Sequence, residues 1–260
     1  PATTDGHNGV AIGVYSKTQN EKAISIGAFN KATGAQSIVI AGNYDTKNSD
    51  GVSTATAARA IAMGAETNVS GEKSVAIGDT NTIASARTYA LGNNINVAAG
   101  ADDSLVFGTR ANVGGESSIA IGKSAKATKS WASAIGTDAI ASGGSGSQAY
   151  GYDSVASGKS AIAQGFHSHA DGQSAIAIGD NAKAGGIATV SVGYMANGQS
   201  ADVDKANTPS TNKATYGTAV GHFAGADYVG TDNLRSTALG NQAGRYGEGG
   251  SINTAVGNQA

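Results

Sequence analysis

A repeat of about fourteen residues is the feature that most restricts how this chain can fold. Sixteen glycines each end a short apolar segment, and eight of the fifteen intervals between them are fourteen residues long. Every other interval is longer. A constant interval with occasional extensions is typical of a solenoid, in which each repeat forms one coil and the extensions form surface loops.

Each repeat contains two short segments in which apolar and small or polar residues alternate. The first segment is clear in Ala175-Ile176-Ala177-Ile178, and the second in Ala182-Lys183-Ala184. Alternation with a period of two is the pattern of a β-strand. Two strands and two turns in each repeat predict an all-β fold, a parallel β-roll (β-solenoid) of ~14-residue coils.

The two faces of the first strand carry different residues, and this difference predicts a core and an interface. We expect the branched apolar residues to fill the core of the roll, because large aliphatic side chains are usually buried. These core residues are Ile12, Ile26, Ile77, Ile121, Ile135, Ile178 and Val192. We expect the small residues to lie against identical chains in a homo-oligomer, since they let backbones approach closely. These interface residues are Ala11, Ala62, Ala76, Ala120, Ala134, Ala163 and Ala177.

The regularity of the repeat divides the chain into two regions. Residues 1–193 contain regular repeats with short insertions, and residues 194–260 continue the repeats with longer insertions. The longest insertion, residues 197–215, is polar and rich in turn-forming residues, which predicts a surface loop. With Pro1 in place of an initiating methionine, we expect the chain to be part of a longer protein.

Composition excludes several classes of partner. The net charge is -2 and no segment offers a basic stripe, which argues against nucleic-acid binding. No apolar run approaches the 18 residues of a membrane span, so we expect no direct membrane insertion by this segment. Cysteine is absent, which excludes disulfides and thiolate metal sites.

No motif in the chain predicts catalysis, a metal or a cofactor. The glycines follow the period of the repeat and do not form a phosphate-binding loop, and no serine lies in a nucleophile motif. His167 and His169 have a spacing that a metal could use, but no third ligand accompanies them at a fixed offset. We therefore expect a binding protein that is not an enzyme. Candidate ligand contacts are Lys126, Lys183, His167, His169, Tyr194, Asp204 and Lys205.

The repeat resembles the YadA-like head of trimeric autotransporter adhesins. The motif is x-Ser-x-Ala-Ile-Gly followed by x-x-Ala-x-Ala-x-Gly, and its best copies begin at residues 73, 117 and 173. The resemblance implies a left-handed roll and a homotrimer of chains packed side by side. It also implies display from the outer membrane of a Gram-negative bacterium and a role as an adhesin head. Family heads bind host matrix proteins of the collagen, fibronectin or laminin class, bind cells or surfaces, or mediate autoaggregation.

Two other functions remain open from the sequence. A trimeric phage or viral fibre segment is the first, because such fibres are also built from short β-strands repeated in a solenoid. An ice-binding solenoid needs a flat array of threonines, but Thr-x-Thr patterns such as Thr54-Ala55-Thr56 are too few to form one.

Overall fold

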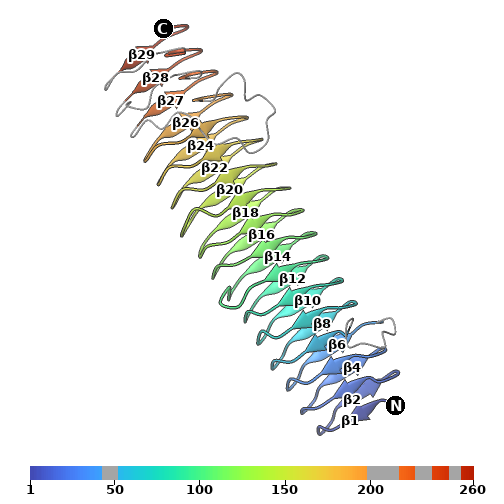
Figure 1. The fold of residues 1–260 in the computed structure, drawn as a ribbon. Helices are drawn as coiled ribbons and strands as arrows, with labels where there is room; N and C mark the ends of the chain where they lie inside the picture. Colours follow the sequence, from blue (N-terminus) through green and yellow to red (C-terminus); the bar gives the residue numbers. More distant parts are fainter. Residues whose placement is uncertain (43–51, 198–216, 226–235, 246–252) are drawn as a thin grey trace. The chain divides into compact units, whose positions relative to one another are not determined.

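The computed structural model describes residues 1–42, 52–197, 217–225, 236–245 and 253–260. These residues form two units, Pro1–Ser124 (unit 1) and Ala125–Ala260 (unit 2). Within each unit the chain winds through successive coils, and each coil adds a rung to two parallel sheets (Figure 1). The predicted all-β parallel solenoid with turns of about fourteen residues is confirmed. The expected change of character after residue 193 stays a prediction.

Sheet A consists of two-residue strands. In unit 1 they are β1 (Thr3–Thr4), β3 (Lys17–Thr18), β5 (Lys31–Ala32), β7 (Thr54–Ala55), β9 (Asn68–Val69), β11 (Thr82–Ile83), β13 (Asn96–Val97) and β15 (Asn112–Val113). In unit 2 they are β17 (Lys126–Ala127), β19 (Ile140–Ala141), β21 (Val155–Ala156), β23 (His169–Ala170) and β25 (Lys183–Ala184).

Sheet B consists of three-residue strands. In unit 1 they are β2 (Val10–Ile12), β4 (Ile24–Ile26), β6 (Ile38–Ile40), β8 (Ile61–Met63), β10 (Val75–Ile77), β12 (Tyr89–Leu91), β14 (Leu105–Phe107) and β16 (Ile119–Ile121). In unit 2 they are β18 (Ser133–Ile135), β20 (Gln148–Tyr150), β22 (Ile162–Gln164), β24 (Ile176–Ile178), β26 (Val190–Val192), β27 (Thr218–Val220), β28 (Thr237–Leu239) and β29 (Thr254–Val256).

Equivalent residues of successive coils lie directly over one another. In sheet B, Ala62 pairs with Ala76, which pairs with Ala90. In sheet A, Asn68 pairs with Thr82 and Val69 with Ile83. Every described pairing is parallel and in register, so each sequence position becomes a row that runs along its unit. A side chain that recurs at one position of the repeat therefore forms a continuous row on the surface.

The structure reverses the expected inside and outside of the three-residue strands. The middle residues point into the roll: Ala62, Ala76, Ala120, Ala134, Ala163 and Ala177 are fully buried within a single chain, and Ala11 is half-buried at the first rungs. The flanking residues point outward: Ile12, Ile26, Ile77 and Ile135 are exposed, and Ile121, Ile178 and Val192 are half-buried. The predicted alanine interface and the predicted isoleucine core are therefore both wrong.

The physical reason for this reversal is the small width of the coil. Two short strands joined by tight turns leave an interior only one side chain deep, and large side chains on both sheets would not fit there. From β3 onward, the second residue of each sheet A strand, such as Ala32 or Val69, is also fully buried. The largest apolar side chain in this inward row of sheet A is Ile83. It lies on the same coil as Ala76 of sheet B and comes before Ala90 in the chain, so a large residue on one sheet is combined with small residues on the other.

Two kinds of glycine make the tight turns possible. The glycine that follows every sheet B strand except β6 has a positive φ, +116° at Gly78, which favours glycine. A Cβ atom at Gly78 would also collide with the carbonyl oxygen of Gly92 on the next coil. Gly71, on the other turn, has no such φ, but a Cβ there would collide with the carbonyl of Ser85. This second glycine is needed for close approach between coils, and not for the positive φ that its place in the repeat suggests.

The last coils of unit 2 differ in the residues that the structure describes. Sheet B continues through β27, β28 and β29, whereas the last described strand of sheet A is β25. Alanines of the turns, Ala196, Ala224 and Ala243, pack with Ala219 and Ala238 in a small apolar core. The interior of these coils is again made of small side chains.

Candidate binding surfaces

The outward side of sheet B forms an apolar face on each unit. We define this face as the first and third residues of the three-residue strands. In unit 1 it consists almost entirely of Ile, Val, Leu, Met and aromatic residues; Ile77 keeps 40% of its surface exposed and Phe107 50%. Because these residues lie in register, the exposed apolar area is continuous along the strands. Such a continuous patch marks an interaction surface in soluble proteins.

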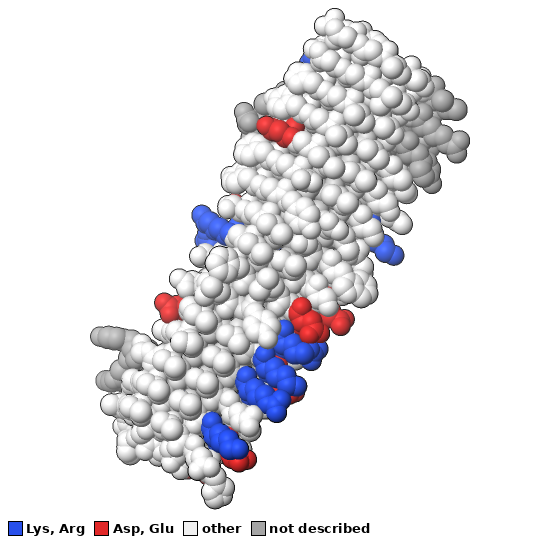
Figure 2. Space-filling view, turned by 180° about the vertical axis from the view of Figure 1, so that it is seen from behind, with Lys and Arg blue, Asp and Glu red and all other residues white. Residues whose placement is uncertain are grey.

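A row of charged side chains follows one turn of unit 1. Arg59, Lys73 and Arg87 occupy the same position on successive coils. The backbone N–H of Lys73 donates to the carbonyl oxygen of Ala58, the residue before Arg59, and the N–H of Arg87 donates to the carbonyl oxygen of Glu72, the residue before Lys73. Figure 2 shows Lys and Arg side chains gathered along one edge of unit 1, with Asp and Glu side chains beside them. The acidic members next along the chain are Asp102, Asp103 and Glu116.

Ion pairs within this charged row neutralise most of its basic groups. Arg87 donates from Nε to Asp103 Oδ1 (2.6 Å) and from Nη2 to Asp103 Oδ2 (2.9 Å). This pairing raises the pKa of Arg87 and lowers the pKa of the Asp103 carboxyl. Lys73 lies 3.1 Å from Glu72, and its hydrogen bond lowers the pKa of that carboxyl. The row is therefore an alternating charged surface and not a purely basic one.

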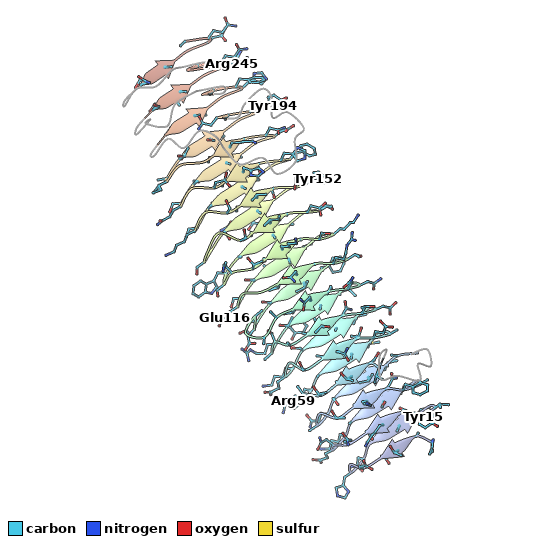
Figure 3. The ribbon with its side chains drawn as sticks, viewed as in Figure 1. Tyr15, Arg59, Glu116, Tyr152, Tyr194 and Arg245 are labelled. Atoms are coloured by element: carbon cyan, nitrogen blue, oxygen red, sulfur yellow. The ribbon has the colours of Figure 1, made fainter. Side chains whose placement is uncertain are left out.

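Aromatic side chains gather on the other turn. Within unit 1, Tyr15 lies on the edge opposite Arg59 and Glu116 (Figure 3), and it stacks on Phe29 with ring centres 5.3 Å apart. In unit 2, Tyr152 stacks on Phe166 of the next coil at 5.2 Å. Stacking along the row follows from the register of the coils, and it leaves ring edges open to solvent. These edges are plausible contact points for a protein partner, because aromatic residues are enriched in interfaces.

Farther along unit 2 a second aromatic group includes a cation. Tyr194 stacks on His222 at 5.2 Å, and the guanidinium carbon of Arg245 lies 4.4 Å above the ring of Phe223. Tyr194 and Arg245 lie on the same edge of unit 2 as Tyr152 (Figure 3). Tyr194, a predicted ligand contact, is half-buried in this group, so part of its surface remains available.

Three of the predicted ligand contacts, Lys183, His169 and His167, are buried within a single chain, so the prediction that they meet a ligand at the surface is wrong. Lys183 and His169 are each 1% exposed, and His167 is 5% exposed. His167 Nε2 lies 3.7 Å from Asp153 Oδ2, and His169 Nδ1 lies 4.0 Å from Asp171 Oδ1. This burial could not be predicted from the repeat, because the positions equivalent to Lys183 in other coils, such as Lys31 and Lys126, are exposed.

The remaining predicted contacts have different outcomes. Lys126 is exposed on sheet A, as expected for its row. Asp204 and Lys205 lie outside the described residues. Trp131 lies in unit 2, on the turn that is equivalent in the repeat to the charged-row turn of unit 1. It is 62% exposed, the largest exposed fraction of any aromatic side chain among the described residues. Contact of any of these residues with a ligand stays a prediction.

The described residues hold no grouping that indicates a metal centre. No three His, Cys, Asp or Glu side chains in this part of the chain come together as metal ligands. In the described parts of the chain, no helix has the length and apolar character needed to cross a membrane. The surfaces that the structure does offer, an apolar sheet face and two turn edges, are suited to binding by contact.

The comparisons with known proteins agree with the repeat and the fold. The model of the YadA head domain repeat matches residues 19–40, 55–84, 99–125 and 156–182. A comparison with curated proteins gives no match. YadA head repeats are structural adhesin domains, typically non-catalytic. The matched segments fall on coils of both units and share the small interior row and the apolar outward row described above. This chain carries YadA head domain repeats, as found in trimeric autotransporter adhesins.

Proposed function

We propose that this chain is the head of a homotrimeric adhesin, displayed from the outer membrane of a Gram-negative bacterium. It attaches the cell to host extracellular-matrix proteins, to cells or to surfaces, and it also mediates autoaggregation. The left-handed sense of the roll is part of this proposal. The observation that carries it is the apolar face, continuous along unit 1, on a chain that carries YadA head repeats.

The apolar face supports assembly of identical chains. Full burial of an Ile, Leu or Phe side chain stabilises a protein by about 1.5–3 kcal/mol. Ile77 is 40% exposed and Phe107 50%, so about half of that stabilisation is unused in a single chain. Covering this face with two further copies recovers the remainder on every coil. Identical chains fit this role because the spacing between their rungs is the same.

Adhesion by many weak contacts follows from the same architecture. Each surface position is repeated from coil to coil, and a trimer presents every row three times. A partner with its own repeated structure, such as a collagen or another matrix protein, could contact several rows at once. Simultaneous contacts raise the effective affinity without a deep pocket, because the second and later contacts form at a high local concentration.

The turn edges and the outer side of sheet A are the surfaces that remain for a partner. The charged row of unit 1 offers Arg59, whose Nε donates a hydrogen bond to the neutral side chain of Gln36. The aromatic edge offers Tyr15 and Tyr152. Lys126 and Tyr194 are additional candidates. All of these lie away from the apolar face, so assembly and ligand binding would not compete.

A binding assay with assembled and dissociated protein tests the proposal. Collagen, fibronectin and laminin are coated on plates beside albumin, and binding of the wild-type chain is compared with that of an Ile77→Lys variant designed to dissociate the trimer. We expect saturable binding to at least one matrix protein and a loss of at least tenfold in the variant. Deletion of residues 197–215 then tests that insertion. Binding no greater than to albumin on every matrix protein would overturn attachment to matrix proteins.

A further inference from the structure

Three consecutive rungs of unit 2 interrupt the apolar face with polar side chains. Ser133 and Gln148 occupy the first position of β18 and β20, and Gln164 occupies the third position of β22. We call these three residues the polar layer. They point outward, with Ser133 and Gln148 half-buried and Gln164 exposed. The next two rungs, β24 and β26, return to the apolar pattern with Ile176, Ile178, Val190 and Val192.

The polar layer is compact because the strands lie in register. Ser133 pairs with Gln148 on adjacent strands, and Tyr150, on the same strand as Gln148, pairs with Gln164. A hydroxyl, two amides and a phenol thus lie within three rungs on one side of the sheet. Among the described residues, none forms a side-chain hydrogen bond with Ser133, Gln148 or Gln164. Their hydrogen-bonding groups are open to whatever covers the face.

Covering the face removes these groups from water, so they need partners from the covering molecule. Buried polar groups without a hydrogen bond are strongly disfavoured. If the cover is two further copies of the chain, the polar layer of one copy finds matching amides and hydroxyls at one height only. A displacement by one rung, about 4.8 Å, toward the C-terminal end of the neighbour places Gln164 opposite the apolar rung β24, and a second such displacement places it opposite β26.

The rest of the face does not distinguish one height from another as strongly. In unit 1 and at β24 and β26 of unit 2 both outward positions are apolar, so a neighbour that slips by a rung there again meets apolar side chains. At β27, β28 and β29 the first position is Thr218, Thr237 and Thr254, and this repeat does not mark a single height either. Repetitive surfaces of this kind specify register weakly. In coiled coils a single buried polar residue in an apolar interface sets register and oligomer state for the same reason.

From this arrangement we infer that Ser133, Gln148 and Gln164 set the axial register in which copies of this chain assemble. The inference rests on the homotrimer of the proposed function and adds what selects its alignment. The polar layer lowers the stability of the interface relative to an all-apolar face, and it makes the in-register trimer the favoured one.

Photo-crosslinking with a fixed probe tests this register. The amino acid p-benzoylphenylalanine is placed at Leu239, an exposed residue of the apolar face three rungs beyond β24, counted along β26, β27 and β28. After irradiation the crosslinked dimer is isolated, and the attached residue of the second chain is identified by mass spectrometry. The probe is introduced into the wild-type chain, into Gln148→Ile/Gln164→Leu, and into Gln173→Ile. Gln173 is an exposed residue on a turn and serves as the matched control.

Light scattering on the same samples gives the number of chains in each assembly. We expect trimers in all three proteins, with crosslinks to residues of one rung in the wild type and the control. In the double variant we expect crosslinks spread over two or more rungs, with the additional rungs taking a share comparable to the first. Trimers of the double variant that crosslink to a single rung would overturn the inference and leave the homotrimer intact. A monomeric wild-type chain would overturn both.

Discussion

The reversed orientation of sheet B leads to opposite effects from neighbouring substitutions on one strand. Ala76 and Ile77 are adjacent on β10, but Ala76 is fully buried inside the roll and Ile77 is 40% exposed on the apolar face. Lysine at position 76 would place a long charged side chain in an interior one side chain deep. Lysine at position 77 would stand in solvent in the single chain and be buried only on assembly. We therefore expect Ala76→Lys to prevent folding and Ile77→Lys to prevent association of a folded chain.

The size of the second effect follows from the exposed surface. Full burial of Ile is worth about 1.5–3 kcal/mol, so the 40% that Ile77 still exposes corresponds to about 1 kcal/mol in each chain. A trimer loses about 3 kcal/mol from the apolar contacts alone, which is on the order of a 100-fold fall in the association constant. Burial of three ammonium groups disfavours the trimer further.

Sedimentation and circular dichroism measure these two effects separately. The matched control is Thr82→Lys, an exposed position on β11 of sheet A on the same coil. We expect Thr82→Lys to remain a trimer, Ile77→Lys to sediment as a single 25.4-kDa chain with an unchanged β spectrum, and Ala76→Lys to lose that spectrum. A folded Ala76→Lys chain, or an Ile77→Lys trimer as stable as the wild type, would refute the assignment of the two faces.

Three further predictions concern the stability of unit 1. Gly78→Ala should destabilise it by about 3 kcal/mol or more in urea unfolding, because Gly78 has φ +116° and a Cβ would meet Gly92; unchanged stability would contradict this. Asn81→Ala should cost about 2 kcal/mol or more in the same assay, since buried Asn81 donates to Gly92 O and accepts from Ile95 N–H, whereas the exposed Asn68→Ala should cost little. Arg87 lowers the pKa of Asp103 below its ordinary value of 3.8, so the contribution of this pair is complete above about pH 4 and is lost as the pH falls through the lower folded-state pKa. The difference in urea stability between the wild type and Arg87→Gln should therefore be larger at pH 7 than at pH 2, and a difference that grows on acidification would contradict the pairing.

The period of the sequence was sufficient to predict the coil. Insertion lengths, the alternation of Ala175-Ile176-Ala177-Ile178 and the recurring glycines all follow from one backbone path repeated many times. Such local patterns are read directly from the chain, because parallel stacking of equal coils places like residues over like. The YadA head resemblance rests on the same repeated residues, and the family model matches on them.

The candidate surfaces were predicted less well, for reasons specific to each residue. Lys126 and Lys183 occupy the same position of the repeat, yet Lys126 is exposed and Lys183 is 1% exposed. The pairing of Arg87 with Asp103 joins residues sixteen apart on adjacent coils, and the length of the intervening insertion obscures it in the sequence. Neither outcome depends on the repeat itself, so neither could be read from the period.

By itself, the sequence determined that this protein is a parallel β-solenoid of fourteen-residue coils and which residues share a row. It also determined that, in most of the three-residue strands, the middle residue is small and the flanking residues are large and apolar. An alternating pattern shows that two sets of residues point to opposite faces of a strand, but it does not show which face lies inside the roll. Only the tertiary structure decided this, because the turns bring the two sheets too close for large side chains on both of them, and the small row of sheet B fills the space opposite residues such as Ile83 of sheet A. That narrow interior turns the large apolar side chains outward and creates the face on which the proposed assembly depends.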